Sequence, residues 1–334
     1  MVVTLKDVAE RAGVSRSAVS RTFTEGASVS ARTREKVEKA ASALGYSPNA
    51  LASSLTTGRT KMIGVVSNNF HNPIFLQVFD LVTKELQNRG LRPLLVNLSD
   101  ETDPAKSLAM LRQYSVDGAI VASSTLPVTF AEAFQEAGLT VVHPFGRQTA
   151  HPKVTTIGID NHAAGALAAS TLIARGYRRI AFLGGPESAT STQDRHAGFL
   201  DEVAKHSDVE ASVSYAASYS FNGGRDEMQR LIGADLAEAY FCGDDVVSIG
   251  ALSALQSAGI DVPGQVGLIG LNDMEMAGWA NINLTTIHNP IGDIIRESVD
   301  LIAQQVGCDP SPPEGRLHSG WIVERGTLRP LPQG

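Results

Sequence analysis

From residue 61 onward the chain alternates short apolar segments with longer amphipathic ones. The apolar segments MIGVV, PLLVNL and GAIVAS are separated by the helix-like stretch PIFLQVFDLVTKEL and by another at 105–113. This alternation predicts βαβ units, because two parallel strands need a long crossover connection and a helix usually supplies it. We therefore expect an α/β fold built on parallel sheets.

The same alternation starts again after residue 160. Helices are expected at 163–174, 194–206, 224–231 and 246–257, between the apolar segments IAFLGG, VSYAA, AYFCG and VGLIGL. Two series predict two doubly wound lobes, with a ligand crevice at the carboxyl ends of their strands. After the turn-rich connector CDPSPPEG, the segment GWIVERGTL is expected to close a sheet. Within a core of 61–334, we assign about 61–160 plus 291–318 to the N-lobe and about 161–290 plus 319–334 to the C-lobe.

The first 46 residues have a different, purely helical period. Leu5, Val8, Ala9 and Ala12 share one helical face, and Thr4 with Asp7 forms a capping box at its start. A second helix is expected at 16–23 after the N-cap Ser15, and a third from Ser30 to Leu44. Two short helices joined by a tight turn predict a helix-turn-helix, so residues 1–46 are expected to form a small three-helix domain.

Residues 47–60 connect this domain to the core. Their sequence is small and polar apart from Leu51 and Leu55, which lie four residues apart. So little apolar surface predicts a marginal helix that becomes ordered only when something packs on it.

Charge is distributed unevenly along the chain. The net charge is −7, but residues 1–61 carry ten Lys and Arg and five acids, giving +5 there and −12 in the remainder. A basic head on an acidic body is the layout expected when only one end meets phosphate. The alternative explanation, a basic disordered tail, fails because the apolar residues of the head recur with a helical period.

Other bulk features exclude several protein classes. No run approaches the ~20 apolar residues of a membrane helix, and acidic residues stand where a signal peptide would be apolar. Cys242 and Cys308 offer neither a disulfide framework nor a metal cluster. We expect a cytoplasmic protein with no membrane contact and no cofactor.

Several segments along the chain resemble the LacI/GalR family of bacterial repressors in order and spacing. They are TLKDVAERAGVSRSAVSR, SARTREKVEKAASALGYSPNALASSL, IGVV, DGAIV, FLGGP, the R-x-x-GF at 195–199, and LTTIHNP. The resemblance implies a helix-turn-helix head on a two-lobed core like a periplasmic binding protein. It also implies a homodimer on a pseudo-palindromic operator in double-stranded DNA, controlled by a sugar, nucleobase or similar metabolite.

The family places base-reading residues at Arg16 and Ser17, with Arg21 near them on the second helix. An arginine can bond guanine O6 and N7 together, although contact with phosphate alone is the alternative reading. The hydroxyls of Thr4, Ser15 and Ser20 are candidate phosphate donors. The loop TFTEG lacks the asparagine usual in the family, which removes one expected backbone contact.

In the connector, Leu55 matches the family's leucine that enters the minor groove at the operator centre. An inserted apolar side chain unstacks a base step and bends the duplex. The alternative is a linker leucine packed on the core. The predicted DNA-binding set is Thr4, Ser15, Arg16, Ser17, Ser20, Arg21, Asn49, Ala52 and Leu55.

For the effector, the resemblance implies an apolar wall in the loop after the first core strand and an arginine in the crevice. Arg195 can fork onto two ligand oxygens, with a surface salt bridge as the alternative. Tyr219 matches an aromatic that stacks on ligand rings, with core packing as the alternative. Gly243 and Asn272 depart from the Asn and Asp usual at two strand ends, so no particular sugar is implied. The predicted effector set is Phe70, Ile74, Phe75, Arg195, Tyr219, Asp244 and Asn272.

Two other classes of function remain as alternatives. A solute-binding module without a DNA role would share the two lobes but lack the basic head. An enzyme using NAD or a phosphosugar would need a phosphate-binding glycine loop, and GGPES does not supply one. Asp244 and Asp245 are interpreted as a helix start rather than a catalytic dyad. The leading hypothesis is a repressor, and its effector can be an inducer or a corepressor.

Overall fold

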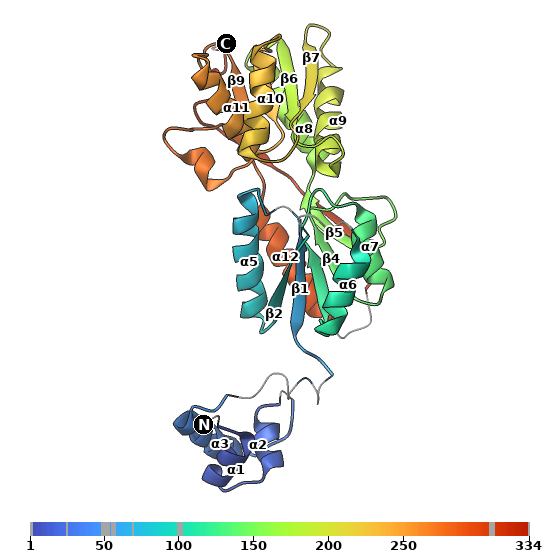
Figure 1. The fold of residues 1–334 in the computed structure, drawn as a ribbon, viewed down its shortest axis with the longest axis vertical. Coiled ribbons are helices and arrows are strands. Elements are labelled where there is room, and N and C mark those ends of the chain that lie inside the picture. Colours follow the sequence, from blue (N-terminus) through green and yellow to red (C-terminus); the bar gives the residue numbers. More distant parts are fainter. Residues whose placement is uncertain are drawn as a thin grey trace. The chain divides into compact units, whose positions relative to one another are not determined.

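The structure is a computed structural model that describes residues 3–24, 26–47, 54, 58–68, 70–98, 103–306 and 311–332. It divides into two compact units, Met1–Lys61 and Met62–Gly334 (Figure 1). Each unit has its own core and is described separately below.

The first unit contains three helices, α1 (Leu5–Ala12), α2 (Arg16–Thr22) and α3 (Ala31–Leu44). The Asp7 carboxylate accepts the backbone N–H of Thr4 at 2.7 Å, which completes the predicted capping box. Gly13 ends α1 in the left-handed region at φ 65°, which glycine adopts without strain. The core is one small cluster from all three helices: Val8, Ala9, Val19, Val37, Ala40 and Ala41. The predicted helix-turn-helix head is confirmed.

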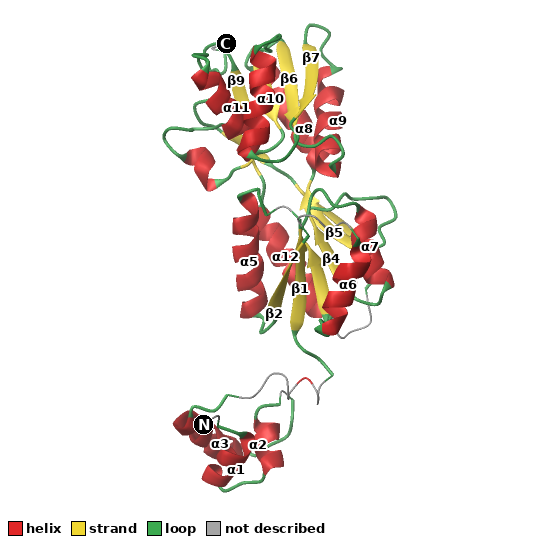
Figure 2. Cartoon of the chain, in the orientation of Figure 1, coloured by secondary structure: helices red, strands yellow, loops and turns green. Residues whose placement is uncertain are grey.

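The N-lobe of the second unit is a parallel sheet of order β11-β5-β4-β3-β1-β2. Its strands are β1 (Met62–Ser67), β2 (Arg92–Asn97), β3 (Gly118–Val121), β4 (Thr140–Pro144), β5 (Thr155–Ile159) and β11 (Gly315–His318). Helices α5 (Ile74–Asn88) and α12 (Ile291–Gln305) cover one face, and α6 (Pro104–Gln113) and α7 (Val128–Glu136) cover the other (Figure 2). Burial on both faces explains why these strands are continuously apolar.

The C-lobe repeats this design with the order β12-β10-β9-β8-β6-β7. Its strands are β6 (Arg179–Gly184), β7 (Glu210–Tyr215), β8 (Ala239–Cys242), β9 (Gly267–Asn272), β10 (Thr286–His288) and β12 (Trp321–Val323), the last antiparallel to β10. One face carries α8 (Asn161–Ala174) and α9 (Thr190–Val203), and the other carries α10 (Phe221–Ile232) and α11 (Asp245–Ser257). A 3-10 turn, η1 (Glu275–Gly278), follows β9. The predicted pair of parallel-sheet lobes is confirmed.

Helices α8 and α9 pack at very short range because of two glycines. A Cβ on Gly165 would lie 2.1 Å from the carbonyl oxygen of Arg195, and one on Gly198 would lie 1.9 Å from that of His162. Any larger residue at either position would push the helices apart. This contact fixes where α9 holds Arg195.

The chain passes between the lobes three times. The crossings follow β5, β10 and β11, and only residues 319–320 separate β11 in one sheet from β12 in the other. Helix α9 begins at Thr190, earlier than the predicted residue 194, and α10 begins at Phe221, earlier than the predicted residue 224. The added turn of α9 is polar, and the added turn of α10 has one apolar side chain, the exposed Phe221, so the apolar period did not reveal either start. Within the described ranges, no helix combines the length and apolar character needed to cross a bilayer.

Candidate functional site

Helix α2 presents a polar face to solvent. Arg16, Ser17, Ser20 and Arg21 are all exposed, while Val19 and Thr22 on the other side are buried. Neither Arg16 nor Arg21 has an ion pair or hydrogen-bond partner for its side chain among the described residues. Positions i, i+1, i+4 and i+5 share one helical face, so the two free guanidinium groups flank two hydroxyls on a single surface.

The predicted phosphate donors differ in how free their hydroxyl groups are. Thr4 donates its hydroxyl to the Asp7 carboxylate at 2.7 Å. The Ser15 oxygen accepts the Ala18 N–H at 3.2 Å and bonds the Ser17 hydroxyl at 2.9 Å. These two side chains therefore already cap helices, and each would have to share its hydroxyl with a phosphate. Asn49, Ala52 and Leu55 lie outside the described residues.

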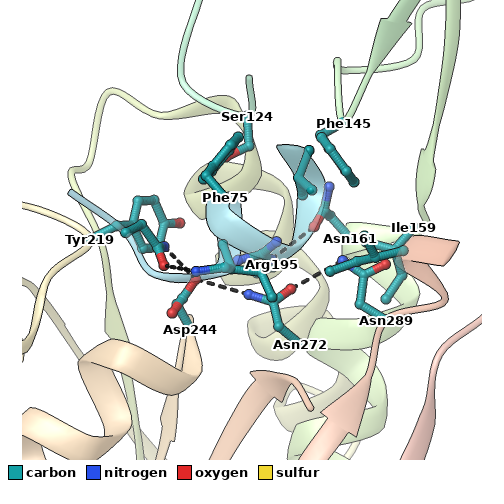
Figure 3. Close-up of a pocket in the computed structure, with 14 residues that line it drawn as sticks. Phe75, Ser124, Phe145, Ile159, Asn161, Arg195, Tyr219, Asp244, Asn272 and Asn289 are labelled. Atoms are coloured by element: carbon teal, nitrogen blue, oxygen red, sulfur yellow. Dashed lines mark hydrogen bonds between the residues drawn. The ribbon is translucent and has the colours of Figure 1, made fainter. Parts of the chain in front are cut away.

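The second unit has a cavity between its lobes at the carboxyl ends of the strands (Figure 3). It has a volume of about 40 Å³, room for a few water molecules. Both lobes and the crossovers contribute to its lining: Asn72, Ile74, Phe75, Val78, Ser124, Phe145, Ile159, Asn161, Arg195, Tyr219, Asp244, Asn272, Asn289 and Ile291. A wider cavity of about 740 Å³ shares Asn72 and Tyr219 with it. The cleft therefore has a narrow inner chamber and a wide outer one.

Six of the seven predicted effector residues lie around the inner chamber. They are Ile74, Phe75, Arg195, Tyr219, Asp244 and Asn272. Phe70 is not among the lining residues, because its ring stacks on Phe79 of α5 with the centroids 4.9 Å apart. This aromatic contact holds Phe70 on the helix rather than in the wall.

Sequence reasoning missed the other eight lining residues. Several follow a strand closely: Phe145 comes directly after β4, Asn289 directly after β10, and Ser124 three residues after the end of β3. Since the carboxyl ends of parallel strands meet at one edge, the residues just beyond each strand were the available signal.

Arg195 is buried in the wall of the inner chamber, with 6% of its surface exposed. Its Nε donates to the Asn161 side-chain oxygen at 2.8 Å, and its Nη1 donates to the Gly243 carbonyl. This burial excludes the alternative of a surface salt bridge. Nη2 and the second hydrogen of Nη1 are left for a ligand, so a fork onto two ligand oxygens is open only at the tip of the guanidinium.

Asp244 is the N-cap of α11 and bridges the two lobes. One carboxylate oxygen accepts the Val246 N–H at 2.8 Å. The other accepts Asn72 Nδ2 from the N-lobe at 3.0 Å and Asn272 Nδ2 at 2.9 Å. Burial raises the pKa of Asp244, and the donated hydrogen bonds act against that rise.

Asp245 does not line the inner chamber, and its carboxylate bonds other groups of the C-lobe. Its carboxylate accepts the Thr286 hydroxyl at 2.5 Å and the Met274 N–H at 2.8 Å. Burial raises the pKa of Asp245 to about 7. The two acids occupy the N-cap and first position of α11 and share no site, so their interpretation as a helix start is confirmed.

Tyr219 serves both the chamber wall and the packing of the C-lobe. Its hydroxyl bonds Thr192 Oγ1 at 2.6 Å, and only 9% of the residue is exposed. A Cβ on Gly185 would lie 2.4 Å from its ring, so the glycine lets the ring lie flat on the chain. One ring face is thus fixed by packing while the edge borders both chambers.

The lobes are bonded to each other across the cleft. Arg147 of the N-lobe pairs with Asp194 on α9, with Nη2–Oδ1 at 2.6 Å and Nε–Oδ2 at 3.0 Å. Ser191 also donates to the Ser124 carbonyl at 3.3 Å. Together with the Asn72–Asp244 bond, these contacts hold the lobes in a closed arrangement.

Reactive groups are scarce where the structure describes the chain. Cys242 is fully buried, and burial raises the pKa of its thiol to about 12, so it stays protonated. Within the described ranges no group of three His, Cys, Asp or Glu is placed to hold a metal ion. The site is arranged to bind by hydrogen bonds and apolar contact.

Comparison with known proteins matches both units. Residues 4–49 match the family of bacterial regulatory proteins called lacI, and residues 169–328 match a periplasmic binding protein-like domain. The chain is 33% identical to the HTH-type transcriptional repressor PurR of Proteus mirabilis (strain HI4320), over 86% of each chain. It is 29% identical to the ribose operon repressor of Escherichia coli (strain K12), over 98% of this chain and 100% of that one.

Among solved structures, the fold is similar to a crystal structure of the Lac repressor dimer bound to operator and the anti-inducer ONPF. That similarity has a TM-score of 0.85 at 25% identity and covers 98% of this chain and 99% of the other. Head, core and order of elements therefore agree with one family along nearly the whole length. This chain belongs to the lacI family of bacterial regulatory proteins and is a DNA-binding transcriptional repressor, not an enzyme, with a small-molecule effector.

Proposed function

We propose that the chain represses transcription as a homodimer on a pseudo-palindromic operator, and that a sugar or sugar derivative controls its DNA affinity. The observation that carries the proposal is the pairing of two features in one chain. One is the exposed face of α2 with two unpaired arginines, and the other is an interlobe chamber with a buried arginine. The similar Lac repressor structure contains a dimer with operator and a small ligand, which supports the same use here.

On the DNA side, Arg16 and Ser17 read base edges and Arg21 lies beside them. Thr4, Ser15 and Ser20 contact phosphates, sharing their hydroxyls between cap and DNA. The connector at 47–60 pairs with its counterpart in the dimer. Leu55 then enters the minor groove, and Asn49 and Ala52 also contact the DNA. In this arrangement two heads read half-sites about one helical turn apart.

On the effector side, the lining supports a polyhydroxylated ligand. Four asparagines and Arg195 line the chamber together with apolar residues such as Ile74 and Phe75. Amides bond hydroxyls in either direction, and apolar side chains cover the C–H faces of a sugar ring. The ligand acts through its different affinity for the closed and open lobes.

The DNA half of the proposal is tested by binding of the full chain to genomic fragments across a range of salt concentrations. We expect some fragment to bind at least ~10³-fold more tightly than random duplex. Arg16→Ala should cost ~1–3 kcal/mol of that preference, and Leu55→Ala should weaken specific binding far more than non-specific binding. No preference for any fragment would leave a solute-binding module as the better description.

The effector half is tested by thermal shift of the full chain against sugars, polyols, sugar acids and nucleobases. A ligand of the folded state raises the apparent melting temperature, and Arg195→Ala should abolish the shift. Repeating the DNA titration with any hit present decides the direction of control. An inducer weakens operator binding, and a corepressor strengthens it.

A further inference from the structure

Four polar side chains form one hydrogen-bonded chain through the inner chamber. Asn289 Nδ2 donates to Asn272 Oδ1 at 3.0 Å, and Asn272 Nδ2 donates to Asp244 Oδ2 at 2.9 Å (Figure 3). From the other lobe, Asn72 Nδ2 donates to the same Asp244 oxygen at 3.0 Å. We call these four residues the amide relay. It joins the second lobe crossing, after β10, to the end of the C-lobe strand β9 and to the N-lobe.

The direction of every bond in the amide relay follows from Asp244. An ionised carboxylate only accepts, so Asn272 must present its NH₂ group to it. Asn272 Oδ1 then has to accept, so Asn289 must present its NH₂ group in turn. The Asn289 oxygen is therefore forced to point away from the relay. The orientation of each amide is set by its neighbours and ultimately by one carboxylate.

That oxygen is the open end of the amide relay. Asn289 is 5% exposed, and its Oδ1 is buried without a hydrogen-bond partner among the described residues. A buried acceptor left unpaired costs ~1–3 kcal/mol relative to a paired one. Because Asn289 lines the inner chamber, the missing donor belongs to whatever fills the chamber.

The backbone beneath the amide relay is also strained. Asn272 has φ 120° and Asp273 has φ 55°, values that non-glycine residues seldom adopt. Strain of this kind persists where surrounding structure holds it, and it gathers at binding sites. Here it directs Asn272 to the position between Asp244 and Asn289.

The formal charges of the chamber lining cancel. Arg195 supplies one positive charge and Asp244 one negative charge, and the other twelve lining residues are neutral. An anionic ligand would have to approach the Asp244 carboxylate without a second cation to offset it. Charge therefore favours an uncharged ligand over a sugar acid or a phosphosugar.

We propose that Asn289 is the specificity-determining residue of the effector site, and that it selects an uncharged ligand that donates a hydroxyl hydrogen to its side-chain oxygen. The proposal rests on the proposed function, since it concerns the same sugar-sized ligand. That hydroxyl continues the amide relay in its existing direction, and bonds in one direction strengthen each other. The ligand thereby reinforces the Asp244–Asn72 bond that closes the lobes.

The direction of the amide relay is tested without any ligand. Asn289→Asp replaces the donor facing Asn272 Oδ1 with an acceptor, so the melting temperature of the full chain at pH 7.5 should fall by roughly 6 °C or more. Asn161→Asp is the matched control, because the Asn161 oxygen already accepts from Arg195 and a carboxylate can do the same. Its melting temperature should stay within about 2 °C of the parent. Equal decreases of the melting temperature in the two variants would overturn the assigned direction of the amide relay.

The ligand class is tested with D-ribose, D-galactose and D-glucose and their monodeoxyfluoro analogues. Fluorine keeps an acceptor but removes the hydroxyl donor. For a sugar that binds, replacing one particular hydroxyl by fluorine should weaken binding to the parent chain about tenfold. The same replacement should weaken binding to Asn289→Ala by less than about twofold. The corresponding sugar acids and phosphates should bind more weakly than the neutral parent.

The outcomes separate this inference from the proposed function. If sugars bind but each fluorinated analogue loses as much affinity for Asn289→Ala as for the parent chain, the donor assignment is overturned and the effector proposal stands. If a sugar acid or phosphate binds more tightly than its neutral parent, the uncharged class is overturned. If none of the neutral sugars binds, the sugar effector and this inference fall together.

Discussion

Gly165→Ala should destabilise the second unit although alanine is the better helix former. The new Cβ would lie 2.1 Å from the Arg195 carbonyl oxygen and 2.8 Å from the Phe199 backbone nitrogen. Both are backbone atoms of α9 and cannot rotate away. The helices would have to separate by about 0.9 Å merely to bring the shorter contact to 3.0 Å, which loosens packing along α8 and α9.

The magnitude follows from two opposing contributions. Overpacking of a buried contact costs up to ~3 kcal/mol, and the gain in helix propensity returns about 1 kcal/mol. A net loss of ~2 kcal/mol corresponds to a melting temperature about 4–8 °C lower for a unit of this size. Because α9 carries Arg195, effector binding should weaken as well.

The assay is thermal unfolding of the full chain followed by far-ultraviolet circular dichroism, with Gly292→Ala as the matched control. Gly292 is also helical, in α12, and nothing lies within 4 Å of the position its Cβ would take. There alanine should stabilise by ~0.4–1 kcal/mol and raise the melting temperature by about 1–4 °C. If the melting temperature of Gly165→Ala rises in the same way, the close contact of α8 and α9 is refuted.

Three further results are expected. Arg147→Ala removes an ion pair whose side chains are 34% and 31% exposed and which is worth at most ~1 kcal/mol, so amide hydrogens at 190–195 should exchange up to about fivefold faster. Lys84→Ala, which removes an ion pair remote from the cleft, should leave their exchange unchanged. Val37→Ala leaves a hole in the small head core at a residue that is 0% exposed, so specific DNA binding should be lost at 37 °C while unfolding of the second unit is unaffected. Burial raises the pKa of Asp245 to about 7, so the folded state keeps a proton between about pH 4 and pH 7 and stability falls as the pH rises. Asp245→Asn abolishes this uptake, and its melting temperature relative to the parent should therefore rise by roughly 5 °C between pH 5 and pH 8; a constant difference would contradict the raised pKa.

Much of the fold could be predicted because its elements have strong local patterns. Continuous apolar strands and 3.6-residue periods located both lobes, and the caps at Thr4, Ser15 and Ser30 located the head helices. The starts of α9 and α10 were placed late because residues 190–193 are polar and residues 221–223 contain one apolar side chain, the exposed Phe221. The close packing of α8 on α9 was also not predictable, because it depends on a glycine, Gly165, whose partners on α9 are distant in the sequence.

The candidate site was predictable in a different way. Arg195, Asp244 and Asn272 were found through resemblance to a family, since nothing in their local pattern marks them as neighbours. Asn289 was missed because its importance is a property of the hydrogen-bonded chain, and it appears only when three side chains from separate strand ends are seen together. Phe70 was misplaced because an aromatic residue beside a pocket can equally pack on its own helix, as it does on Phe79.

The short passage from β11 to β12 affects how such a chain is made. The sheets of both lobes acquire their last strand only from residues 315–323, whereas the head is complete within the first 61. At ~5–20 residues per second, the ribosome completes the DNA-binding unit many seconds before it has synthesised the last strand of either lobe's sheet. A nascent or prematurely terminated chain would then carry the basic helical head beside two open sheet edges, and the cell's proteases and chaperones would have to remove it before it reached DNA.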